Sequence, residues 1–245
     1  VLDHRVLTFA FVASISFLLL SYGALQLFQR GARSYEIAIR RPHLVQACVQ
    51  SGVFVYWGSA WSQVAVQAPL ILAQIIFAFG CDALVSWRRY GHWRLGLGPI
   101  PVVLSTNLFL WFIDDYFFLQ FAMIALAYAS RDFLVTHTNG ERRHIFNPSA
   151  FALAIAAVGL LIFRVPELTH GANIAQTLGS PEYPYIWIFL MGFVVQGFFG
   201  VTMVTLAAAL ALFFWGQVYF TWFETYYYLD TSIPIAVFLG MNLLI

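Results

Sequence analysis

The stretch RDFLVTHTNGERRHIFNPSAFALAIAAVGLLIF, from Arg131 to Phe163, decides the fold class. It begins as a polar, arginine-rich loop and passes at Asn147 directly into an uninterrupted apolar run. An apolar run of this length is what a helix needs to cross the hydrocarbon core of a bilayer. The stretch therefore predicts a membrane helix, preceded by a loop that holds a specific group of side chains at the membrane boundary.

The composition of the whole chain agrees with an integral membrane protein. Of the 245 residues, 61% are hydrophobic and only 9% are charged, whereas about a quarter of a soluble domain is charged. The lipid bilayer is therefore the first expected partner, and a net charge of +1 gives no indication of nucleic-acid binding. Every basic residue is an arginine, so the chain has no lysine for Schiff-base chemistry. Cys48 and Cys81 lie in apolar segments without metal-ligand spacing, and we expect two core thiols.

Hydropathy predicts an all-α, polytopic bundle of about nine membrane spans. No polar stretch is long enough to fold as a separate domain outside the bilayer. Residues 1–43 are expected to form an N-terminal membrane helix and an arginine-rich loop, and residues 44–245 one transmembrane domain that continues past the last residue. The predicted helices cover residues 6–28, 44–61, 65–87, 99–113, 116–130, 147–163, 185–199, 201–223 and 231–245.

The arginines predict how these spans are oriented. With nine alternating spans, the loops at 29–43, 88–98 and 131–146 fall on one side and carry ten of the twelve basic residues. Cytoplasmic loops are enriched in basic residues. We therefore expect these three loops to be cytoplasmic, the loop at 164–184 to lie on the outer side, and the chain to reside in a bacterial inner membrane.

Asp82 is the only carboxylate well inside a predicted span. A charge at that depth needs either a partner or a function. One hypothesis is an ion pair with Arg88 or Arg89 near the end of the same helix. The other hypothesis is a cation or proton site on an ion pathway.

Uncharged polar residues add two weaker patterns. Gln46 and Gln50 share a helix face, as do Gln67 and Gln74, and these amides are expected to hydrogen-bond between helices. Two short segments, 100–107 and 233–242, each open with Ile-Pro and end in Asn. Short proline-opened helices in corresponding halves suggest an inverted repeat. Two ordinary helices that begin with proline explain the pattern more simply.

The most specific pattern is GERRHIFNPSAFAL, at residues 140–153. Arg142, Arg143 and His144 could face an anion, and Asn147 offers both a donor and an acceptor. The proline that follows suits the first turn of a helix, whose free N–H groups and dipole favour a negative group. The alternative interpretation is a capped turn whose arginines only set the membrane topology.

This pattern resembles the loop-to-helix motif of the NqrB/RnfD family, whose members are integral membrane components of the sodium-translocating NADH:quinone reductase and of the Rnf electron-transport complex. The likeness extends in outline over residues 65–245, with Asp82 about where the family has an acidic residue at a helix end. The resemblance implies one subunit of a membrane redox complex. Electrons would pass through FMN while sodium ions or protons cross the membrane.

The family carries FMN as a phosphoester on a threonine in a short S-G-A-T motif of the outer loop. The nearest match in this chain has Asn173 where that threonine should be, and an amide has no hydroxyl to esterify. The resemblance therefore implies FMN or riboflavin held without a covalent bond, or no cofactor, while covalent FMN would need another hydroxyl such as that of Thr169 or Thr177. The residues expected to contact a cofactor are Arg142, Arg143, His144 and Asn147 on the inner side, and Thr169, His170, Gly171, Asn173 and Thr177 on the outer side.

Three functions stay open at this level. The first is a redox subunit with a flavin or quinone site inside the helix bundle. The second is a transport or channel-like bundle that depends on Asp82, and the third is a structural subunit that anchors soluble redox partners. No Ser-His-Asp, Cys-His or phosphate-binding glycine pattern is present in the sequence, which argues against common hydrolases and kinases. We expect a membrane subunit of an electron-transport complex.

Overall fold

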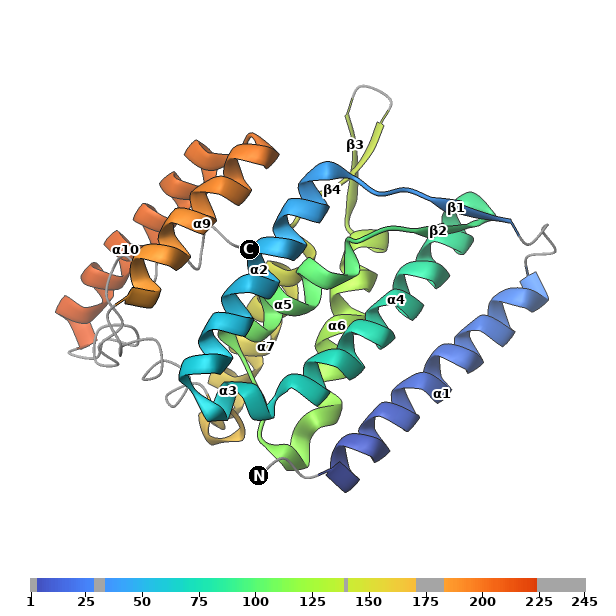
Figure 1. Ribbon diagram of the computed structural model, residues 1–245, viewed down its shortest axis with the longest axis horizontal. Coiled ribbons are helices and arrows are strands. Elements are labelled where there is room, and N and C mark those ends of the chain that lie inside the picture. The colour runs from blue at the N-terminus through green and yellow to red at the C-terminus, as the bar shows by residue number, and fades with distance from the viewer. Residues whose placement is uncertain (1–3, 29–33, 139–140, 171–182, 224–245) are drawn as a thin grey trace.

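Apolar helices make up most of the protein (Figure 1). The computed structural model describes residues 4–28, 34–138, 141–170 and 183–223. The helices are α1 (His4–Phe28), α2 (Arg41–Ala60), α3 (Ser62–Val66), α4 (Ala68–Tyr90), α5 (Pro99–Phe109), α6 (Phe117–Phe133), α7 (Pro148–Phe163), α9 (Tyr183–Phe199) and α10 (Thr202–Phe223). Two single 3₁₀ turns, η1 (Asp114–Tyr116) and η2 (Pro166–Leu168), precede α6 and follow α7.

Eight of the nine helices expected from hydropathy are found within a few residues of their predicted bounds. The ninth, at 231–245, lies outside the described residues, and so does the second half of the suggested inverted repeat. Prolines explain several helix starts, because a residue without a backbone N–H fits the first turn. Pro42, Pro69, Pro99 and Pro148 occupy such positions.

Among the residues that the structure describes, two helices, at His4–Leu27 and Ala68–Tyr90, are long and apolar enough to cross a membrane. The other apolar helices are shorter, and among them α5 has 11 residues. At 1.5 Å per residue α5 rises only about 16 Å, roughly half the thickness of a hydrocarbon core. After α5 the chain continues in extended form from Leu110, which has φ −143° and ψ 124°.

Four short strands in the arginine-rich loops were not part of the prediction. Strand β1 (Tyr35–Ile37) pairs in parallel with β2 (Trp93–Leu95). Strand β3 (Val135–Thr138) pairs antiparallel with β4 (Glu141–His144). Runs of three or four residues are too short to show a periodicity, so hydropathy could not reveal them. The sequence did hold one signal for the hairpin, because an Asn-Gly dipeptide separates β3 from β4.

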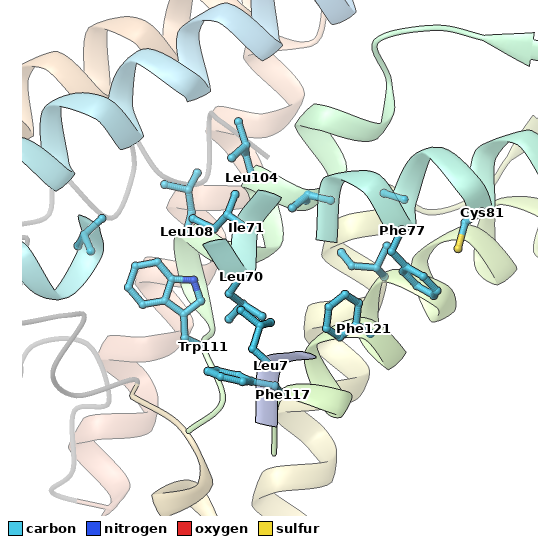
Figure 2. Close-up of a cluster of buried hydrophobic side chains, with 14 of the residues drawn as sticks. Leu7, Leu70, Ile71, Phe77, Cys81, Leu104, Leu108, Trp111, Phe117 and Phe121 are labelled. Atoms are coloured by element: carbon cyan, nitrogen blue, oxygen red, sulfur yellow. The ribbon is translucent and has the colours of Figure 1, made fainter. Parts of the chain in front are cut away.

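The hydrophobic core lies where α4 packs against α1, α5 and α6. Phe77 of α4 meets Phe121 of α6 edge to face, with ring centroids 5.5 Å apart, and Figure 2 shows the two rings side by side. Leu7 of α1 belongs to the same cluster as Leu70 of α4 and Phe117 of α6. The N-terminal helix therefore shares one core with the helices that follow it.

All four strands lie at the same end of the bundle, and α3 and η1 lie at the opposite end (Figure 1). The loops between α1 and α2, α4 and α5, and α6 and α7 therefore meet at one end. This strand-bearing end is the end at which the sequence concentrates its arginines. Helix α7 begins next to β4 and ends with Arg164 in a left-handed conformation, with φ 55°.

Gly96 is required where the two loops of the parallel ribbon approach each other. The N–H of Ala38 donates to the carbonyl oxygen of Leu95 at 2.8 Å. A Cβ atom on Gly96 would stand only 2.9 Å from the carbonyl oxygen of Ala38. Because that neighbour is backbone, it can move away only if the ribbon itself shifts.

We expect the Gly96→Ala substitution to loosen the ribbon locally. Overpacking of this kind costs about 1–2 kcal/mol, which corresponds to roughly tenfold faster amide exchange in a segment that opens locally. Hydrogen–deuterium exchange of a peptide covering residues 34–38 measures the effect. Gly159→Ala in α7 is the control, because a Cβ there meets nothing within 4 Å. Equal exchange of residues 34–38 in both variants would contradict the prediction.

Candidate functional site

Five charged side chains gather where α4 and α6 end, and they form the ionic cluster. Its members are Asp82, Arg88, Arg89, Arg131 and Asp132. Both carboxylates are largely buried, with 8% of Asp82 and 3% of Asp132 exposed. Buried carboxylates stay ionised only when basic groups compensate them, and the three arginines provide that compensation.

Asp132 receives both arginines from the last turn of α4. Arg88 donates to one carboxylate oxygen of Asp132, and Nε of Arg89 donates to the other at 2.5 Å. Nη2 of Arg89 also donates to the backbone carbonyl of Arg131 at 2.5 Å. Arg88 in addition stacks over the ring of Phe133, 4.8 Å from its centroid. These contacts hold the end of α4 against the end of α6.

Asp82 pairs with Arg131 of α6, whose Nη2 lies 2.6 Å from Oδ1. The hypothesis of an ion pair near the helix end is confirmed, but the partner expected from the sequence, Arg88 or Arg89, is wrong. Seven residues separate Asp82 from Arg89 along α4, which is about 10.5 Å of rise. In the structure both Arg88 and Arg89 bind Asp132 instead, and the partner of Asp82 comes from α6.

Asp132 is the functional-looking residue that sequence reasoning missed. The predicted helix ended at residue 130, which placed this carboxylate in a solvated loop. In the structure α6 continues to Phe133, and Asp132 turns into the bundle. The sequence did contain an indication of this role, because a carboxylate in a segment rich in arginine favours an ion pair.

The motif around Asn147 forms the start of α7. The Asn147 side-chain oxygen accepts hydrogen bonds from the backbone N–H of Ser149 at 3.1 Å and from its hydroxyl at 2.8 Å. Pro148 is the first residue of the helix. Phe146 stacks on Phe151 with ring centroids 5.5 Å apart. An N-cap, a first-turn proline and a hydrophobic contact across the cap are three independent helix-start signals.

The four residues expected to form an inner anion-facing cluster take different positions. Asn147 caps α7, as the alternative interpretation of the motif proposed. Arg142 and Arg143 lie in β4, where their backbones pair with His137 and Thr136. His144 ends that strand opposite Val135. His144 lies within electrostatic range of the ionic cluster, because Arg131 and Arg89 both act on its imidazole.

The pKa of His144 is lowered from its ordinary value. Partial burial of the imidazole is the main cause, and the positive charges of Arg131 and Arg89 add to it. Much of this side chain is nevertheless exposed, so solvent weakens the charge effects. The neutral imidazole is therefore favoured beside the arginines at neutral pH.

At the opposite end, the segment after α7 pairs with the chain that follows α5. The N–H of Ile113 donates to the carbonyl of Leu168 at 2.9 Å, and the N–H of His170 donates to the carbonyl of Trp111 at 2.8 Å. Thr169 forms an isolated bridge with Phe112. The structure therefore brings Thr169 and His170, two of the expected outer residues, against the end of α5. Gly171, Asn173 and Thr177 lie outside the described residues.

Trp111 connects the backbone pairing between the segments after α5 and α7 with the interior of the bundle. Its indole stacks on that of Trp57 from α2, with centroids 5.5 Å apart and planes inclined by 19°. Its Nε1 donates to the side-chain oxygen of Asn107 at 2.6 Å. Only 2% of Trp111 and 3% of Trp57 are exposed. The two rings thus form a buried aromatic pair, and the backbone of one of them, Trp111, hydrogen-bonds to His170.

Beside Trp111, buried side-chain amides connect α4, α5 and α6. Asn107 donates to Gln74 at 2.6 Å and accepts from Gln120 at 3.2 Å. Gln120 also donates to the carbonyl of Leu110 at 2.9 Å, which satisfies the backbone where α5 ends. Elsewhere Gln50 of α2 donates to the Ser105 hydroxyl at 2.9 Å. The expectation that these glutamines bond between helices is confirmed for Gln50 and Gln74.

A cavity of about 420 Å³ opens between α2 and α9, next to the tryptophan pair. Its lining is apolar and aromatic and includes Cys48, Val53, Tyr56, Trp57, Trp187 and Met191. Cavities of this size accept a flat aromatic ring system. Cys48 is exposed and Cys81 is buried, so the expectation of a core thiol is confirmed only for Cys81. Within the described part of the chain, no group of three His, Cys, Asp or Glu side chains could hold a metal ion.

We expect Asp132→Asn to destabilise the protein strongly. The substitution leaves two arginines beside an uncharged, almost fully buried amide, and breaking a buried pair in this way costs about 3 kcal/mol. The midpoint of thermal unfolding in detergent measures the loss. Glu36→Gln is the matched control, because half-exposed Glu36 lies 3.6 Å from Arg94 and such surface pairs contribute less than about 1 kcal/mol. A control shift as large as that of Asp132→Asn would refute the structural importance of the cluster.

The lowered pKa of His144 predicts a loss of stability in acid. As the pH falls through about 6.5, the unfolded chain takes up this proton before the folded chain does, and folding becomes less favourable. His144→Gln removes the effect, so its unfolding midpoint should fall less than that of the wild type between about pH 7.5 and pH 5.5. His92→Gln in the β1–β2 ribbon serves as the control. Parallel pH profiles for the wild type and His144→Gln would show the assignment to be wrong.

No protein-family model matches the chain, and no curated protein or solved structure is significantly similar to it.

Proposed function

We propose that this chain is a polytopic membrane subunit of an electron-transport complex, similar to the NqrB/RnfD family that its Asn147 motif resembles. It spans a bacterial inner membrane, and its arginine-rich end lies on the cytoplasmic side. Electrons pass by way of a flavin or quinone held without a covalent bond near the Trp57–Trp111 pair. Other subunits of the complex supply and remove the electrons.

The exposed surface of the helices supports a bilayer environment. Phe9 of α1, Phe163 of α7, Met203 of α10 and Trp222 of α10 are each more than three-quarters exposed, at 79%, 76%, 76% and 78%. Soluble monomers rarely present apolar side chains so densely on several helices. The mutual pairing of Trp111–Ile113 with Leu168–His170 also suits this setting. Non-helical backbone at membrane depth is tolerated where protein satisfies its hydrogen bonds.

One observation carries the redox part of the proposal, namely the contact between the outer segment and the aromatic pair. The segment Leu168–His170 opens the loop where the resemblance implies a flavin, and its backbone pairs with that of Trp111. Trp57 also lines the neighbouring cavity together with Tyr56 and Trp187, and aromatic side chains of this kind pack against an isoalloxazine or quinone ring. The neighbouring cavity has room for a ring of that kind. Gly171, Asn173 and Thr177 are proposed to complete the site.

An anchoring role is the second candidate, and a specific observation favours it. Two of the side chains that first suggested cofactor or ion chemistry at the inner end have structural partners. Asn147 caps α7, and Asp82 is paired with Arg131. A subunit that only anchors soluble redox partners would need such structural contacts but no cofactor site of its own. The pairing of Asp82 also leaves the ion-pathway hypothesis without a specific structural observation in its favour.

The two candidates differ in whether a redox group accompanies the purified protein. We expect a dark protein band on a denaturing gel under flavin fluorescence, because Asn173 offers no hydroxyl for an ester. The solvent extract of the same preparation should contain flavin or quinone in an amount comparable to the chain. An extract without either group would reject the redox proposal in favour of the anchoring role. A fluorescent band would instead mean covalent flavin, with Thr169 or Thr177 as the candidate acceptors.

Substitution of the aromatic pair locates the group. Trp111→Leu removes the indole beside the outer segment and should lower the extracted flavin or quinone several-fold. Trp222→Leu changes a 78% exposed tryptophan of α10 and should leave the content unchanged. Circular dichroism verifies that both variants keep their helices. Equal content in both variants would place the group elsewhere.

A further inference from the structure

The parallel ribbon of β1 and β2 has one apolar and one polar face. Residues paired directly across a parallel ladder present their side chains on the same side. Tyr35 pairs with Trp93 and Ile37 with Leu95, so these four side chains share the apolar face. The other face carries Glu36 opposite Arg94, and their charged groups lie 3.6 Å apart.

The apolar face is unusually exposed for its composition. Tyr35 is 72% exposed and Ile37 is 69% exposed, and Ile39 continues the alternation at 59%. Trp93 and Leu95 are each 39% exposed. Within the described residues, protein therefore covers less than a third of Tyr35 and of Ile37, although it covers the larger part of Trp93 and Leu95. Exposed apolar surface of this kind marks a site of interaction.

The contact made by Trp93 shows which way the apolar face is turned. The Trp93 ring meets the ring of Tyr22 from α1 edge to face, with centroids 6.1 Å apart. Helix α1 is long and apolar enough to span a bilayer. Its neighbouring surface is apolar, with Leu20 75% and Leu27 81% exposed. The apolar face of the ribbon thus continues the exposed apolar surface of a membrane helix.

We propose that the β1–β2 ribbon is an interfacial anchor whose apolar face inserts into the headgroup–acyl boundary of the cytoplasmic leaflet. The inference rests on the membrane placement in the proposed function, but not on its redox chemistry. Tyrosine and tryptophan prefer this boundary. Exposed Arg40 and Arg41 follow β1 closely and face the anionic headgroups that basic segments attract. The polar face, with Glu36, His92 and Arg94, turns toward water.

Neighbouring residues on opposite faces allow a matched test. In a Cys48→Ala and Cys81→Ala background, Ile37→Cys and Glu36→Cys are each labelled with an environment-sensitive nitrobenzoxadiazole dye. The full chain is reconstituted in vesicles of phosphatidylcholine and phosphatidylglycerol. Lipids with a spin label near the headgroup should quench the dye at position 37 several-fold more than at position 36. Aqueous iodide should show the reverse order.

A third label separates failure of this inference from failure of the membrane placement. Leu19→Cys reports on α1, where Leu19 is 65% exposed. Lipid quenching at position 19 together with iodide quenching at position 37 would overturn the anchor, and would give this face to a soluble partner protein. Iodide quenching at both positions would overturn the membrane placement itself. Lipid quenching at positions 19 and 37, with position 36 open to iodide, supports the anchor.

Discussion

An apolar surrounding offers no water to a buried polar group, and this constraint explains most of the specific contacts in the protein. Asn107 satisfies Gln74 of α4, Gln120 of α6 and Trp111, which follows α5, at the point where α5 ends. Gln120 covers the backbone carbonyl of Leu110. The extended chain beyond α5 finds its partners in the segment after α7. The break at the end of α5 is thus matched by donors and acceptors from other parts of the chain.

The helices could be predicted from the sequence because their signal is local. Long apolar runs and first-turn prolines appear in one stretch of chain, so eight helices were expected close to where they are found. The distribution of arginines likewise indicated that the loops of α1–α2, α4–α5 and α6–α7 share one end. The parallel ribbon could not be predicted, since β1 and β2 are three residues each and lie far apart in sequence.

The candidate site was predictable only in part, for the same physical reason. The burial of Asp82 was visible in its apolar context, but its partner comes from another helix, and one sequence does not give inter-helix contacts. Asn147 shows the opposite case. Its motif was recognised as specific, and Phe146, Asn147, Pro148 and Phe151 all contribute to starting one helix. A motif can therefore be distinctive because a helix has to begin at a defined place.

Consecutive residues of opposite charge at the end of α6 have a consequence for how this helix is seated. Arg131 and Asp132 are separated by about 100° around the helix axis, and they bind Asp82 and the Arg88–Arg89 pair respectively. A rotation of α6 by one residue in one direction would set Asp132 against Asp82, and in the other direction it would set Arg131 against Arg88 and Arg89. Smooth apolar helix surfaces can pack at many angles with similar energy. The two ion pairs therefore fix the rotation of α6 about its own axis, which apolar packing alone would leave undefined.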